Sequence, residues 1–316
     1  MGLYTVNSKI DLSIVIPLYN EEESVRELYY KIQQVLEKLN STYEICFIDD
    51  GSTDGSLGQL KELKNKHPQI KIISFRKNYG KSAALSEGFD LAEGEIIITM
   101  DADLQDDPEE IPNLLGKIEA GYDMISGWKK KRQDPISKTL PSKFFNWTTS
   151  MLTGIKIHDF NCGLKAYRKD VVKEIPVYGE LHRYLPVLAH WLGYRVGEVV
   201  VKHHARRYGK TKYGLRRFFD GFFDLLTVLF LTRYRQKPMH LFGLLGLVTF
   251  FLGTIILGYL TVLWFIGTGI GNRPLLFLGI LLVIVGMQSF SIGLIGEMIT
   301  NTKDELRIYS VKEKLL

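Results

Sequence analysis

One stretch of this chain, EIIITMDADLQDDP at residues 95–108, indicates both its fold and its chemistry. The first half is a β-branched run that predicts a buried strand. The second half is a turn crowded with carboxylates, after which Pro108 opens a helical pattern. A buried strand that ends directly in charged side chains is typical of a sheet whose strand ends bind a ligand.

The same alternation of strand and helix extends on both sides of this stretch. Strands are expected at SIVIP (13–17), YEICFI (43–48), IKIISF (70–75) and YDMIS (122–126), and helices at 21–39, 54–66, 81–92 and 108–120. Strands separated by helices predict an α/β fold with a mostly parallel, Rossmann-like sheet and helices on both faces. Ligands of such sheets bind beyond the carboxyl ends of the strands.

The residues that follow these strands are polar. They are Tyr19–Glu22, Asp49–Ser52, Arg76–Lys81 and Asp101–Gln105. No strand is followed by a G-x-G-x-x-G turn, and the sequence has no Walker lysine loop. Dinucleotide-dependent oxidoreductases and P-loop nucleotide hydrolases are therefore disfavoured.

The acidic turn is a candidate metal site. Asp101, Asp103, Asp106 and Asp107 lie close together in sequence, beside Gln105. Carboxylates this dense repel one another unless a cation neutralises them, and oxygen ligands suit Mg²⁺ or Mn²⁺ shared with substrate phosphates. We interpret Asp106 and Asp107 as a solvated turn that caps the next helix. Asp101 and Asp103 are the expected ligands, with a solvated turn as the alternative.

The C-terminal part of the chain is apolar. Arg273 is the only charged residue between Pro238 and Glu297. The uncharged stretches 241–266 and 275–296 are each long enough to cross a hydrocarbon core of about 30 Å. They predict a transmembrane hairpin, with two buried helices of a soluble core as the alternative.

Basic residues flank this hairpin on both sides. They are Arg233, Arg235 and Lys237 before it, and Lys303, Arg307, Lys312 and Lys314 after it. The positive-inside rule therefore places both termini and the N-terminal domain in the cytoplasm. No basic region followed by an apolar core is found at the N-terminus, so no cleavable signal peptide is expected. The glycosylation sequons at Asn40 and Asn146 are then expected to stay unused.

Residues 213–234 carry phenylalanines and leucines at helical spacing, with arginines and aspartates on another face. This pattern predicts an amphipathic helix in the membrane interface, with packing on the soluble domain as the alternative.

Composition disfavours several other classes. The 40 Lys and Arg residues against 35 Asp and Glu give a net charge of +5, too weak and too evenly mixed for a nucleic-acid-binding protein. Hydrophobic residues are 46% and charged residues 24%, which disfavours a disordered chain. Cys46 and Cys162 are too few for a disulfide framework or a cysteine metal site.

Taken in order, the motifs of the chain resemble those of one enzyme family. They are IVIPLYNE (14–21), FIDDGSTDGS (47–56), RKNYGKSAAL (76–85), MDADLQDDP (100–108), HDFNCGLKAY (158–167) and RRYGKTKY (206–213). The set is similar to that of inverting family 2 glycosyltransferases with the GT-A fold, within them the polyprenyl-phosphate glycosyltransferases. The two C-terminal spans make the bacterial bactoprenol glucosyltransferases the most similar group.

This resemblance implies a domain order and a reaction. The expected domains are a cytoplasmic GT-A catalytic domain at 1–212, an amphipathic interfacial helix with linker at 213–237, two transmembrane helices at 238–300 and a cytoplasmic tail at 301–316. The implied reaction moves a single sugar from UDP-glucose to undecaprenyl or another polyprenyl phosphate at the cytoplasmic face of the inner membrane. Alternatives are a GDP-mannose or UDP-amino-arabinose donor, a soluble acceptor, and a nucleotide-sugar-binding scaffold without catalysis.

The resemblance also implies roles for single residues. Nucleotide-sugar binding falls to Pro17, Tyr19, Glu21, Asp50, Lys81, Asp101 and Asp103, and Mg²⁺ or Mn²⁺ binding to Asp101, Asp103 and Gln105. Phosphate or acceptor binding falls to Lys129, Arg132, Arg206 and Lys212, and catalysis to Asp103 and Asp159. Lys129 or Arg132 is expected to replace an arginine that relatives carry after the fifth strand. Asp159 is expected to orient the acceptor or sugar, with proton removal as the alternative.

The implied partners are a nucleotide sugar, a polyprenyl phosphate, the membrane, further copies of the chain in a homo-oligomer (a tetramer), and a downstream flippase or lipid-linked glycosyltransferase. No nucleic acid is expected. His158, His203 and His204 lack a common ligand spacing and are interpreted as structural or interfacial.

Overall fold

The computed structural model describes residues 10–130, 136–179, 181–205 and 237–301, together with Arg207, Thr227, Phe230 and Tyr234. The chain divides into two compact units, Met1–Leu226 and Thr227–Leu316, and each is described by itself. Most of the expected interfacial helix at 213–234, and the expected tail beyond 301, lie outside the described residues.

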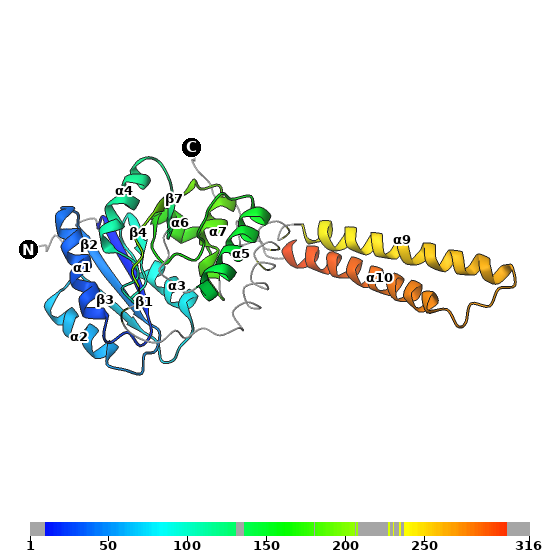
Figure 1. Ribbon diagram of the computed structural model, residues 1–316, viewed down its shortest axis with the longest axis horizontal. Coiled ribbons are helices and arrows are strands. Elements are labelled where there is room, and N and C mark those ends of the chain that lie inside the picture. Colours follow the sequence, from blue (N-terminus) through cyan, green and yellow to red (C-terminus); the bar gives the residue numbers. More distant parts are fainter. Residues whose placement is uncertain are drawn as a thin grey trace, which may run out of the picture. The chain divides into compact units, whose positions relative to one another are not determined.

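The first unit is built on a seven-stranded sheet of order β3-β2-β1-β4-β6-β5-β7 (Figure 1). The strands are β1 (Leu12–Leu18), β2 (Tyr43–Asp49), β3 (Ile70–Ser74), β4 (Ile96–Thr99), β5 (Met124–Trp128), β6 (Lys165–Arg168) and β7 (Val196–Val200). The helices around it are α1 (Val25–Lys38), α2 (Ser56–Lys66), α3 (Lys81–Leu91), α4 (Ile111–Glu119), α5 (Ile136–Thr153), α6 (Lys169–Glu174) and α7 (Leu185–Trp191), with short 3₁₀ turns η1 (Pro108–Glu110) and η2 (Leu181–Arg183). The expected α/β fold with a mostly parallel sheet is confirmed.

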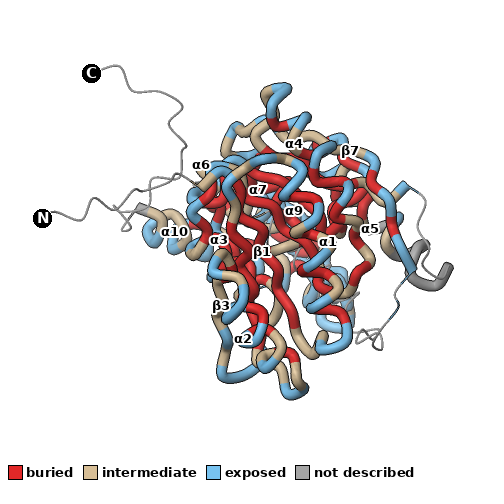
Figure 2. Tube along the Cα trace, turned by 90° about the vertical axis from the view of Figure 1, so that its left-hand side faces the viewer, coloured by how far each residue is buried: buried red, intermediate tan, exposed pale blue. Residues whose placement is uncertain are grey.

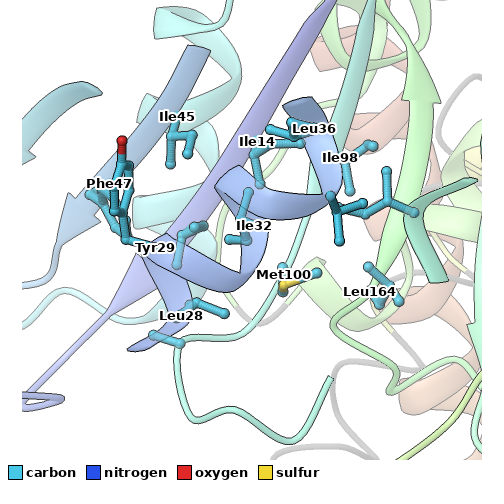
Figure 3. Close-up of a cluster of buried hydrophobic side chains, with 14 of the residues drawn as sticks. Ile14, Leu28, Tyr29, Ile32, Leu36, Ile45, Phe47, Ile98, Met100 and Leu164 are labelled. Carbon is cyan, nitrogen blue, oxygen red and sulfur yellow. The ribbon is translucent and has the colours of Figure 1, made fainter. Parts of the chain in front are cut away.

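Helices cover both faces of the sheet. Because side chains along a strand alternate between its faces, each strand contributes apolar residues to both layers of packing. Ile14 of β1 belongs to the same buried cluster as Leu28 and Ile32 of α1, which repeat at helical spacing (Figure 3). On the opposite face, Gly88 of α3 lies so close to Val15 that an added Cβ would come within 2.3 Å of its side chain. Figure 2 shows the buried strands beneath the partly exposed helices of this unit.

Strand β6 departs from the parallel arrangement. It is antiparallel to β4 and β5, and its first residue, Lys165, is the partner of both Thr99 and Ser126. An antiparallel strand begins where its parallel neighbours end, so the loop before β6 lies at the carboxyl ends of β4 and β5. This reversal places residues 158–165 at the edge where a ligand of the sheet would bind.

The second unit contains two long apolar helices, α9 (Pro238–Phe265) and α10 (Pro274–Asn301). Their most apolar windows have a mean hydropathy of 2.3 and 2.4, and only 17% and 11% of those windows are buried. The core helices of a soluble protein would be mostly buried, whereas exposed apolar helices of this length suit a lipid environment. The pair thus has the properties of a transmembrane hairpin.

Glycines bring the two helices of the hairpin into close contact. Gly246 and Gly253 of α9 are seven residues apart, as are Gly279 and Gly286 of α10. An added Cβ would lie 2.8 Å from a carbonyl oxygen of the facing helix at Gly246 and Gly253, and 2.6 Å from the Phe250 nitrogen at Gly286. Small residues at such positions let apolar helices pack through their backbones in lipid.

Replacing Gly286 by alanine should therefore loosen the hairpin. The added methyl group meets backbone that cannot move aside, so a loss of about 1–3 kcal/mol in unfolding free energy is expected. Gly258→Ala is the matched control, because nothing lies within 4 Å of its Cβ position. Detergent-titrated unfolding of the full chain measures both, and equal stability of the two variants would contradict this packing.

Candidate active site

The first group of candidate site residues lies at the carboxyl ends of β1 and β2. Asp50, directly after β2, is buried, and its two carboxylate oxygens accept hydrogen bonds from the Tyr79 and Gly80 backbone nitrogens at 2.7 and 2.9 Å. Burial raises the pKa of Asp50 in spite of these bonds. Gly51 permits the close approach, since its φ is +70° and an added Cβ would lie 2.5 Å from the Lys77 carbonyl carbon. Asp50 therefore fixes the loop that leads into Lys81.

The neighbouring turn after β1 carries the other expected nucleotide-binding residues. Pro17 is buried within the strand, and Tyr19 and Glu21 are half-buried beyond it. Asn20 between them has a φ of +54°, and its side-chain oxygen accepts a hydrogen bond from the Thr53 nitrogen at 2.7 Å. The parallel register of β1 and β2 brings this turn beside Asp49 and Asp50.

Asp101, at the end of β4, lies in a positively charged setting. Its carboxylate forms an ion pair with the Lys81 ammonium from the start of α3. Burial opposes its charge, but Lys81 and Lys129 outweigh that effect and lower the pKa of Asp101 to about 2. Gly163 makes room for the carboxylate, because an added Cβ there would lie 2.5 Å from it. Asp101 is therefore ionised throughout the physiological pH range.

The acidic turn after Asp101 is held in a strained conformation. Leu104 has a φ of +61°, unusual for a bulky residue, and its side chain is buried in the core. The half-buried Asp103 accepts a hydrogen bond from the Gln105 nitrogen at 3.2 Å. Gln105 also pairs through its backbone oxygen with the His204 nitrogen at 2.9 Å. Tertiary packing, rather than local preference, thus sets the direction of this turn.

The oxygen atoms of this turn are suited to a divalent cation that takes some of its ligands from the protein and the others from a substrate. No group of three or more His, Cys, Asp or Glu residues in the described part of the chain is arranged to hold a metal. Two carboxylates from Asp101 and Asp103, with the amide of Gln105, are hard oxygen donors of the kind Mg²⁺ and Mn²⁺ accept while keeping positions for phosphate oxygens. The metal assignment stays a prediction.

The burial of Asp106 contradicts the expectation that this residue belongs to a solvated turn. Its side chain is fully buried and forms an ion pair with Lys129 at 2.7 Å, whose own side chain is only 11% exposed. Burial would lower the pKa of Lys129, but Asp106 and Asp101 outweigh it and raise that pKa. Asp107 does cap the next turn, accepting a hydrogen bond from the Glu109 nitrogen at 3.0 Å, and it also contacts His204. Lys129 therefore lies beside the acidic turn, paired with Asp106, and its expected contact with phosphate stays a prediction.

Asp159 lies in the loop before β6 and is buried. One of its carboxylate oxygens accepts a hydrogen bond from the Asn161 nitrogen at 3.1 Å, and its backbone oxygen accepts one from the Ser126 hydroxyl. Asn146 of α5 holds the same loop, donating from its side chain to the His158 oxygen at 2.9 Å. The expected role of Asp159, in orienting the acceptor or sugar or in removing a proton, stays a prediction.

Two groups at the site were not anticipated from the sequence. Lys165, at the start of β6, is buried, donates to the Cys162 backbone oxygen, and has a pKa lowered by burial. His182 of η2 bonds through Nδ1 to the Ser82 hydroxyl at 2.9 Å, and burial together with Lys81 lowers its pKa well below the usual value. The reversal at β6 was the missing signal for Lys165, and no sequence pattern indicated η2.

Arg132, Arg206 and Lys212 lie outside the described residues. Arg207, between the last two, forms an ion pair with Glu27 of α1 at 3.2 Å. Their expected contacts with phosphate stay predictions.

Comparison with known proteins decides the family. A model described as Glycosyl transferase family 2 matches residues 13–176, which contain Asp50, Asp101 and Asp159. The chain belongs to glycosyl transferase family 2. Among its relatives in this family is the dodecaprenyl-phosphate galacturonate synthase of Rhizobium johnstonii, 38% identical over 93% of this chain and 88% of that protein. An undecaprenyl-phosphate 4-deoxy-4-formamido-L-arabinose transferase of Pseudomonas fluorescens is 34% identical over 94% of this chain and 87% of that one.

Solved structures share the fold of this family 2 chain. Glucosyl-3-phosphoglycerate synthase from Mycobacterium tuberculosis, in complex with Mn²⁺, uridine diphosphate and phosphoglyceric acid, has a TM-score of 0.55 and 16% identity. The match covers 71% of this chain and 78% of that one. The first unit therefore has the α/β GT-A fold, as expected.

Breaking the ion pair between Asp106 and Lys129 should lower the free energy of unfolding. Lys129→Met leaves a buried carboxylate without its cation, which should cost about 3–5 kcal/mol of unfolding free energy. Adding Asp106→Asn removes the uncompensated charge, so the double variant should recover most of that loss. Thermal and chemical unfolding of the full chain compares them, and additive losses in the double variant would contradict the ion pair.

Proposed function

We propose that this family 2 chain transfers a single sugar from a nucleotide sugar to a polyprenyl phosphate. The observation that carries the proposal is the pairing of Lys81 with Asp101 at the end of β4, in a chain that also contains two helices suited to a membrane. Relatives that match nearly its full length are named as synthases and transferases of polyprenyl-phosphate sugars. A scaffold without catalysis has less support, since the acidic turn and its lysine are both present.

The proposed site binds the donor along the ends of β1, β2 and β4. Tyr19, Glu21 and Asp50 line the nucleoside side, and Lys81 faces the diphosphate. Asp101 and Asp103, with Gln105, would hold Mg²⁺ or Mn²⁺. When bound, this ion stabilises the negative charge that grows on the leaving diphosphate. The solved structure of the same fold that contains Mn²⁺ and uridine diphosphate offers a precedent for such a donor.

The acceptor supplies its own nucleophile in the proposed reaction. A phosphate monoester has a second pKa near 6, so its oxygen is largely deprotonated at pH 7. That oxygen attacks the anomeric carbon, the bond from this carbon to the diphosphate oxygen breaks, and the nucleoside diphosphate leaves with the electron pair. The buried Asp159 positions the loop before β6 and need not take a proton.

The identity of the sugar that the donor carries is proposed from the relatives. The resemblance favoured UDP-glucose, whereas the relatives are named for galacturonate and for 4-deoxy-4-formamido-arabinose. We therefore propose a UDP-sugar as donor and place galacturonate first, because that relative is the more similar of the two at 38% identity. The formamido-arabinose donor comes second, followed by UDP-glucose and GDP-mannose.

The proposed location is the cytoplasmic membrane, with the first unit and both termini in the cytoplasm. Basic residues before α9 and after α10, against only Arg273 between the helices, support this orientation. Assembly into a tetramer and delivery of the product to a flippase stay proposals that follow from the resemblance.

The full chain in detergent or nanodiscs should convert undecaprenyl phosphate and a labelled UDP-sugar into a lipid-extractable, acid-labile product. Turnover with UDP-galacturonate should exceed that with UDP-glucose and GDP-mannose by at least about tenfold, which corresponds to about 1.4 kcal/mol of transition-state discrimination. No lipid product with any of the four donors would reject the transfer itself, and preference for UDP-glucose would reject only the sugar assignment.

The metal assignment is tested by substituting the acidic turn. Asp103→Ala should lower kcat by about a hundredfold or more, because charge on the leaving group loses its stabilisation. Asp107→Ala is the matched control in the same turn, since its carboxylate caps η1 and contacts His204, and it should change kcat by less than about threefold. Full activity of the wild-type chain in EDTA would contradict the assignment of a catalytic metal.

A further inference from the structure

The first turn of helix α3 is held on both sides by contacts from distant parts of the chain. Gly80, which precedes the helix, has a φ of +94° and no side chain that could cap it. On one side, Asp50 accepts a hydrogen bond from the Gly80 nitrogen at 2.9 Å. On the other side, the buried Ser82 contacts His182 of η2, which lies 100 residues further along the chain. Lys81 lies between these two anchoring points.

His182 contacts Ser82 through two of its atoms. Its Nδ1 lies 2.9 Å from the Ser82 hydroxyl oxygen, and its backbone nitrogen donates to the same oxygen at 3.2 Å. Two bonds to one buried hydroxyl fix the position of Ser82 as well as the direction of its side chain. Because Ser82 directly follows Lys81 in the helix, these bonds also restrict the backbone from which the Lys81 side chain extends.

The imidazole of His182 is neutral at physiological pH. Burial, together with the positive charges of Lys81, Arg183 and Lys165, lowers its pKa well below the usual value. A neutral ring forms its bond to Ser82 without adding a cation that would repel Lys81. Of the three cations, Arg183 and Lys165 are buried, whereas the Lys81 side chain is 30% exposed. Lys81 is therefore the cation of this group that an anionic ligand can reach.

We propose that His182 is a positioning residue for donor binding, which acts through Ser82 to hold Lys81 towards the donor diphosphate. The inference rests on the proposed function, in which Lys81 faces that diphosphate. A lysine side chain has many rotamers, and ordering it on binding costs free energy unless the protein restricts it beforehand. The ion pair with Asp101 restricts it, and this pair requires the start of α3 to stay at a fixed distance from the end of β4. The bonds from His182 to Ser82 supply that constraint.

Two variants of His182 with the same branching separate the hydrogen bond from packing. His182→Leu loses the side-chain bond to the Ser82 hydroxyl, whereas His182→Asn places an amide atom where Nδ1 stood. Binding of labelled UDP and labelled uridine to the full chain, in detergent with Mg²⁺, is measured by equilibrium dialysis. His182→Leu should weaken UDP binding by at least about fivefold and uridine binding by less than about twofold. His182→Asn should bind both ligands within about twofold of the wild-type chain.

A second set of variants tests whether His182 acts through Lys81. Lys81→Met should itself weaken UDP binding, and adding His182→Leu to it should weaken UDP binding no further, because the side chain that His182 positions is gone. Ser82→Ala is a smaller change that removes the shared hydroxyl, and it should match His182→Leu in UDP affinity. Thermal unfolding of every variant checks its fold, and Ser82→Ala carries the test if His182→Leu does not fold.

Three outcomes would overturn the proposal and leave the proposed sugar transfer untouched. Equal UDP affinities of His182→Leu and His182→Asn would mean that the bond to Ser82 does not position Lys81. Equal losses for UDP and uridine would mean that His182 supports the nucleotide site as a whole. Additive losses of His182→Leu and Lys81→Met would mean that His182 acts elsewhere. An unchanged UDP affinity of Lys81→Met would instead reject the donor contact of Lys81 in the proposed function, and this proposal with it.

Discussion

The structure of the site depends on the neutralisation of carboxylates by lysines at the carboxyl ends of β4 and β5. Asp101 is paired with Lys81, and the fully buried Asp106 is paired with Lys129. A buried charge without its partner costs about 3–5 kcal/mol, a large share of the stability of a domain. Lys129 is therefore needed for the stability of the fold, because its partner Asp106 is fully buried.

The same pairing matters for the proposed chemistry, because both substrates are anions. A donor diphosphate and an acceptor phosphate repel one another, and they meet only where positive charge offsets this repulsion. Lys81 lies at the surface of the site, 30% exposed, where a diphosphate can reach it. Lys129, with a side chain that is 11% exposed, and the buried Lys165 act through the local field instead. Preorganised charge of this kind needs no rearrangement when the leaving group forms.

Much of this arrangement could be predicted from local sequence pattern. The β-branched runs and helical spacing gave the parallel strands β1 to β5 and the helices between them, because each of these elements satisfies its hydrophobic period locally. The position of Asp101 at the end of a strand followed from the general rule for open α/β sheets, and its role stays a prediction. The hairpin followed from length and from the absence of charge.

The remainder depends on contacts between distant residues. Strand β6 has four residues, too few for a period, and its antiparallel direction is set by its neighbours. Asp106 looked solvated because its partner, Lys129, belongs to another strand end. Asn146 matched a sequon, and only the packing of α5 against the loop of Asp159 gives it a role.

The central claim is that the acceptor phosphate is the nucleophile, activated by its own charge in a positive site and without a protein base. The most direct test is the pH dependence of kcat/KM for two acceptors, a polyprenyl phosphate and its thiophosphate analogue, whose second pKa is lower. The acidic limb reports the ionisation of the free reactants. The account predicts a limb near pH 6 for the phosphate that moves to lower pH with the thiophosphate. A limb at the same pH for both acceptors would assign it to a group on the protein and contradict the claim.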